Sequence, residues 1–188
     1  MVPLSAVLRN LFGVTPTRGA DARSVAAVSA ERVGEVREGQ KLVPSLRAAL
    51  DVSRAGNGVL IFSTMPAEVL ATLVLLAMST VTKENGDPLA RAERQHLDAA
   101  AGQAVDLAIW FDDMPLTIHE LAARIRRLAA EWERFRKSGE PLRRLALVVF
   151  DDSSRGAPHE DQSGRSLKRV AAELGVSIVV VQDAKHAE

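Results

Sequence analysis

The chain has 188 residues, of which 47% are hydrophobic but only 4% aromatic, so its core must be built from aliphatic side chains. Its 24 basic and 24 acidic residues balance, which gives the whole surface no net attraction to nucleic acid or to a membrane. It has no cysteine, which excludes disulfides, thiolate metal sites and a cysteine nucleophile. Because no apolar run approaches the roughly 20 residues of a membrane helix and no signal-peptide pattern opens the chain, we expect a cytoplasmic protein.

The first 21 residues predict a short helix followed by a linker. Leu4 to Phe12 has apolar residues at helical spacing, Gly13 ends the pattern, and Gly, Pro and Thr dominate as far as Asp21. We therefore divide the chain into an N-terminal helix and linker, residues 1–21, and one α/β domain, residues 22–188. The apolar side of the helix is expected to dock either on its own domain or on a neighbouring subunit.

The first half of the domain begins with an ambiguous segment. Ser24 to Ser29 fits a small strand, or equally the start of a helix that continues through Val33 and Val36. A helix is predicted next, over residues 42–55, followed by a buried strand over 58–63 and an apolar helix over 67–81.

The second half continues the alternation of helices and strands. It predicts a polar helix over residues 89–103, a strand over 106–111, and a long helix from Thr117 to about Lys137 that opens with a capping box of Thr117 and Glu120. Asp112 and Asp113, between them, are interpreted as a turn and as favourable charge for the start of that helix.

The last strand, helix and strand form the most clearly patterned unit. A strand over residues 145–150 stops at Asp151, a helix covers 163–174, and a strand over 176–181 stops at Gln182. A right-handed crossover makes the two strands parallel, so Asp151 and Gln182 should lie at the same edge of the sheet, where such folds bind ligands. The whole chain is thus predicted to be α/β, with a mostly parallel sheet and helices on both faces.

Four segments in this order resemble the C-terminal ATPase domain of DnaB-type replicative helicases. They are GVLIFSTMPAEVL from Gly58, FDDMPLTIHELAARIRRL from Phe111, LALVVFDD from Leu145 and SLKRVAAELGVSIVVVQ from Ser166. The resemblance implies a RecA-like three-layer sandwich. It also implies that Asp151 stands where the family has its magnesium-binding Walker B aspartate, and Gln182 where it has a sensor glutamine.

The chain departs from that family where the family holds and splits a triphosphate. A phosphate loop reads GxxxxGK[ST], whereas the nearest approach here has Gly34 and Gly39 but a displaced Lys41 followed by Leu42. The catalytic glutamate of the family is replaced within Ser63-Thr64-Met65-Pro66. The chain also ends soon after Gln182, before the family's later strands, DNA-binding loop and arginine finger.

These features give two functional hypotheses. The first is a domain that has lost ATP hydrolysis and acts as a structural or regulatory partner of another protein or of itself, with no cofactor expected. The second is a divergent motor subunit that uses Mg-ATP, with Asp151 binding the metal and Gly34, Gly39 and Lys41 near the phosphates.

A third hypothesis is nucleic-acid binding by basic residues of two helices. This patch consists of Arg124, Arg127, Arg134, Lys168 and Arg169. The alternative is an ordinary solvated face, because glutamates are interspersed among these residues. The four histidines are scattered and show no metal-ligand spacing, and His119 is expected to face solvent.

Overall fold

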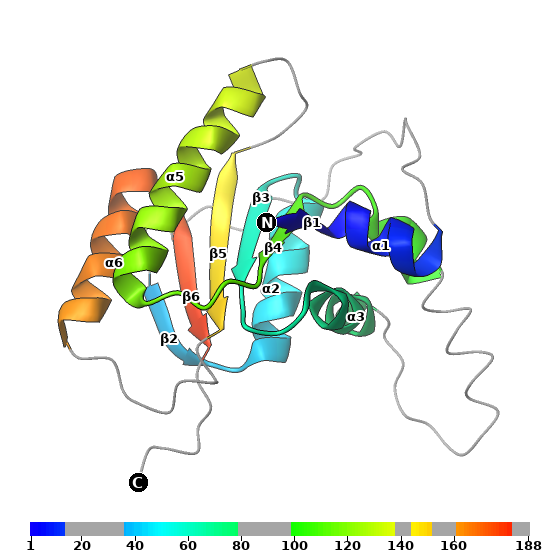
Figure 1. Cartoon of the computed structure of the whole chain (residues 1–188), viewed down its shortest axis with the longest axis horizontal. Helices are drawn as coiled ribbons and strands as arrows, with labels where there is room; N and C mark the ends of the chain where they lie inside the picture. The colour runs from blue at the N-terminus through cyan, green and yellow to red at the C-terminus, as the bar shows by residue number, and fades with distance from the viewer. Residues whose placement is uncertain (14–35, 79–98, 138–143, 152–160, 182–188) are drawn as a thin grey trace, which may run out of the picture.

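The strands form one sheet in the order β1-β4-β3-β5-β6-β2, with helices on both of its faces (Figure 1). The computed structural model describes residues 1–13, 36–78, 99–137, 144–151 and 161–181. The strands are β1 (Val2–Pro3), β2 (Val36–Gln40), β3 (Gly58–Phe62), β4 (Ile109–Asp112), β5 (Leu145–Asp151) and β6 (Ser177–Val181). The helices are α1 (Leu4–Phe12), α2 (Leu42–Arg54), α3 (Ala67–Met78), α5 (Ile118–Lys137) and α6 (Asp161–Leu174). Residues 99–104 are also helical.

Among the strands of the described residues, the five from β4 across to β2 run parallel, and the two-residue strand β1 pairs antiparallel with β4. The central pair is β3 and β5, in which Leu60 lies opposite Val148 and Phe62 opposite Phe150. Every residue of β3 is buried, as expected for a strand covered on both faces. The predicted α/β class with a mostly parallel sheet is therefore confirmed.

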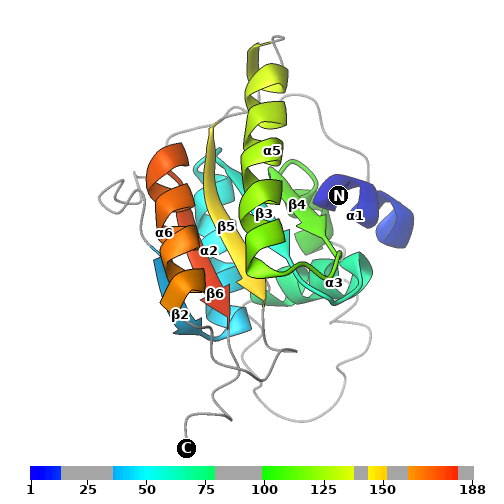
Figure 2. The same ribbon diagram turned by 60° about the vertical axis from the view of Figure 1, so that its left-hand side comes forward.

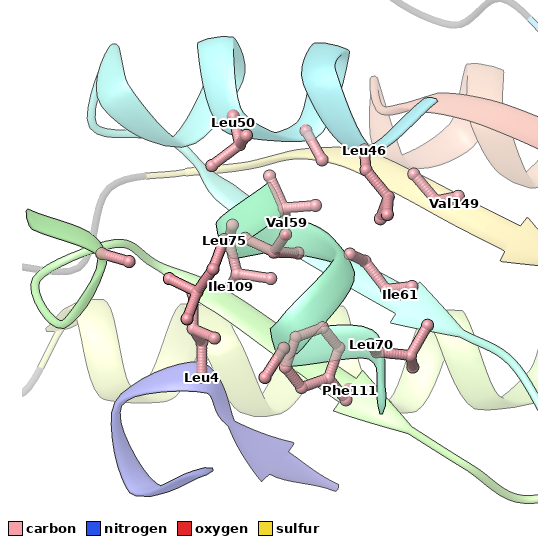
Figure 3. Close-up of a cluster of buried hydrophobic side chains, with 14 of the residues drawn as sticks. Leu4, Leu46, Leu50, Val59, Ile61, Leu70, Leu75, Ile109, Phe111 and Val149 are labelled. Atoms are coloured by element: carbon pink, nitrogen blue, oxygen red, sulfur yellow. The ribbon is translucent and has the colours of Figure 1, made fainter. Parts of the chain in front are cut away.

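One face of the sheet is covered by α1, α2, α3 and residues 99–104, whose side chains share one apolar cluster with alternate residues of the strands (Figure 3). Leu46 and Leu50 of α2 meet Val59 and Val149 of the sheet, while Leu4 of α1 lies near Ile109. The N-terminal helix was expected to dock either on its own domain or on a neighbouring subunit, and in the structure it packs against its own domain. Gly13 ends α1, as predicted, and it adopts the left-handed conformation.

The other face is covered by α5 and α6, which lie side by side (Figures 1 and 2). Leu121, Ile125, Leu128 and Trp132 of α5 are buried in the apolar cluster of this face. The predicted capping box is also present: Thr117 N donates to Glu120 Oε2 at 2.7 Å, and Glu120 N donates to Thr117 Oγ1 at 3.3 Å. His119 is exposed, as expected.

Several element predictions need correction. Val36–Gln40, read as part of a loop or of a helix, forms the edge strand β2, parallel to β6. The strand expected over residues 106–111 begins three residues later, at Ile109, because residues 105–107 form a turn after the helix at 99–104. The possible strand at residues 24–29 lies outside the described residues.

Gly58, the first residue of β3, lies directly beneath the ring of Trp132 from α5. A Cβ at residue 58 would overlap the six-membered part of the indole. The ring has little room to move, because Trp132 is only 4% exposed and makes an edge-to-face contact with Trp110, at 4.3 Å between centroids. The absence of a side chain at residue 58 thus lets α5 approach the sheet closely.

We expect Gly58→Ala to lower the free energy of unfolding by about 1–3 kcal/mol, because the added methyl group must displace a packed ring. Gly102→Ala is the matched control: Gly102 is helical with open space around it, so the same change should be neutral or slightly stabilising. Denaturant unfolding of both variants measures the difference, and equal effects would contradict the proposed close contact.

Candidate functional site

Three polar side chains lie at the carboxyl edge of the sheet, at the ends of three neighbouring strands. Ser63 directly follows β3, while Asp112 and Asp151 are the last residues of β4 and β5. All three are buried, at 3%, 2% and 5% exposure. Buried carboxylates need partners, so the hydrogen bonds of these groups decide what chemistry this edge can support.

Asp151 is held by the hydroxyl group of Ser63. Ser63 Oγ donates to Asp151 Oδ2 at 2.7 Å, and the same hydroxyl accepts a hydrogen bond from Met65 N at 3.1 Å. The hydroxyl therefore acts as a bridge from the turn after β3 to the end of β5. The sequence assigned a role to Asp151, whereas Ser63 lies in a segment of the helicase resemblance that gave its hydroxyl group no role.

Asp112 forms an ion pair with Arg124 of α5. Arg124 Nε lies 3.0 Å from Asp112 Oδ2, and Met114 N donates to Asp112 Oδ1 at 3.3 Å. The backbone carbonyl of Asp112 also accepts a hydrogen bond from Ser63 N at 3.1 Å. The interpretation of Asp112 as a turn residue was therefore wrong, because it is a buried strand end that anchors the long helix.

The basic patch predicted for nucleic acid is divided by its ion pairs. Arg124, 27% exposed, points inward to Asp112, and Arg127 pairs with Glu131 one turn later on α5, at 3.1 Å. Arg134, Lys168 and Arg169 are exposed. The structure thus places the members of the patch on two adjacent helices but directs one of them into the domain.

The segment that most resembled a phosphate loop is not a loop where the structure describes it. Gly39 lies within β2, whose backbone pairs with β6, and Lys41 alone separates that strand from α2. A phosphate loop needs several backbone N–H groups turned toward the ligand between the strand and the helix. Gly34 lies outside the described residues.

The structure tests the predicted proximity of Asp151 and Gln182 for Asp151 alone. Asp151 lies opposite Val181 in the parallel pair of β5 and β6, so both strands end at the same edge. Gln182 itself lies outside the described residues, as do His96, His159 and His186.

In chemical terms the described edge is a closed polar network. Among the described residues, the Ser63 hydroxyl group bonds to a carboxylate and to a backbone N–H, and no histidine is hydrogen-bonded to it to act as a base. Ser63 is also buried, at 3% exposure. Within the described ranges no group of three or more His, Asp or Glu side chains is placed to hold a metal ion. None of the described helices is both long and apolar enough to cross a membrane.

Comparison with known proteins adds no family to these observations: no protein-family model matches the chain, and no curated protein matches it.

We expect Ser63→Ala to destabilise the fold by about 1–3 kcal/mol, because the buried Asp151 carboxylate loses a hydrogen-bond donor. Ser45→Ala is a suitable control, since Ser45 is also buried but its hydroxyl group donates to the carbonyl of Lys41, the N-cap residue of its own helix. It should change stability by less than about 0.5 kcal/mol. Denaturant unfolding distinguishes the two, and similar losses would show that Ser63 does not support Asp151.

Arg124→Met should cost about 1–3 kcal/mol, because the buried Asp112 carboxylate would lose its cationic partner while solvent around Arg124 moderates the loss. Arg127→Met removes an equally basic residue from the exposed face of the same helix, where such pairs contribute about 0.2–1 kcal/mol. Thermal and denaturant unfolding should rank the two variants clearly. A larger effect at Arg127 would refute the anchoring role of Arg124.

Proposed function

We propose that this chain is a degenerate RecA-like domain without a functional phosphate loop, which acts as a non-catalytic structural or regulatory partner in DNA replication or a related nucleic-acid process. The proposal joins two lines of argument. One is the resemblance of four segments to DnaB-type helicases, and the other is the chemistry of the carboxyl edge of the sheet.

The observation that carries the non-catalytic part is the hydrogen bond between Ser63 and Asp151. A magnesium-binding aspartate must present its oxygens to the metal or its waters. Here Asp151 is 5% exposed, and its Oδ2 accepts a hydrogen bond from inside the fold. This hydrogen bond, together with the strand conformation of Val36–Gln40, favours a domain that no longer binds a nucleotide.

The arrangement of the strands supports the helicase resemblance. The four resembling segments supply β3, the last two residues of β4, β5 and β6, and these four strands are contiguous in the sheet. All of them run parallel, so the ends of their motifs lie along one edge. Open α/β sheets bind ligands at that edge, which makes it the correct place to test for a nucleotide.

A second candidate is a divergent ATP-dependent helicase or motor subunit that uses Asp151 for Mg-nucleotide. The observation in its favour is that a hydroxyl group and a carboxylate, Ser63 and Asp151, lie together at this edge. Both are oxygen ligands of the kind that magnesium prefers. This candidate requires the network to open when nucleotide arrives.

Thermal unfolding with millimolar Mg-ATP separates the two candidates. We expect no rise in the midpoint for the wild-type chain, because a ligand raises it only by binding the folded state. A rise of several degrees that disappears in Asp151→Asn would overturn the non-catalytic proposal and support the motor. Asp151→Asn keeps the shape of the side chain and its hydrogen bond to Ser63, so the variant should remain folded.

A further inference from the structure

We draw no further inference here: the strongest candidate, the apolar outward side of α3 on which Val69 and Leu76 are exposed, carries none, because nothing in the described part of the chain shows what covers it.

Discussion

Strand β3 is fixed at both of its ends by contacts that reach beyond its own pairing with β4 and β5. At the amino end, Gly58 admits the ring of Trp132, so that α5 lies close against the sheet. At the carboxyl end, the Ser63 hydroxyl bonds to Asp151 while the Ser63 backbone bonds to the carbonyl of Asp112. Because β3 is the central neighbour of both strands, these contacts set the relative position of β4, β5 and α5.

This constraint also determines the chemistry of the carboxyl edge. A carboxylate at the end of a parallel strand is available for metal or substrate only when the fold does not already satisfy it. Asp112 and Asp151 are both satisfied from within, one by Arg124 and the other by Ser63. The position of these residues therefore resembles that of an α/β active site, whereas their hydrogen bonding resembles that of a structural network.

Apolar patterning explains which parts of the fold could be predicted from the sequence. The strands β3, β5 and β6 consist mostly of Val, Leu, Ile and Phe without polar alternation, a pattern typical of a strand covered on both faces. The sequence predicted the bounds of each to within two residues. By contrast, β2 has the sequence VREGQ. One arginine, one glutamate and one glycine among five residues do not predict a strand. Pairing with β6, which is a tertiary interaction, therefore determines the conformation of β2.

The polar network at the site was less accessible to sequence reasoning, because its partners are far apart in the chain. Ser63 and Asp151 are separated by 88 positions, and nothing near Ser63 marks it as a partner of a carboxylate. Similarly, Arg124 is one of several arginines on α5, and only the proximity of Asp112 distinguishes it from Arg127. Spacing within a helix predicts which side chains share a face, but it does not reveal which carboxylate lies opposite them.

The two edges of the sheet consequently differ in what they offer to another molecule. At the carboxyl edge, the buried carboxylates of Asp112 and Asp151 are hydrogen-bonded to other side chains of the domain. At the amino edge, a pocket between α5 and α6 is lined by five apolar residues together with two arginines and two glutamates. The two edges are stabilised by different contacts, Ser63 with Asp151 at one and Arg126 with Glu173 at the other, so a substitution at one edge is expected to leave the other edge in place.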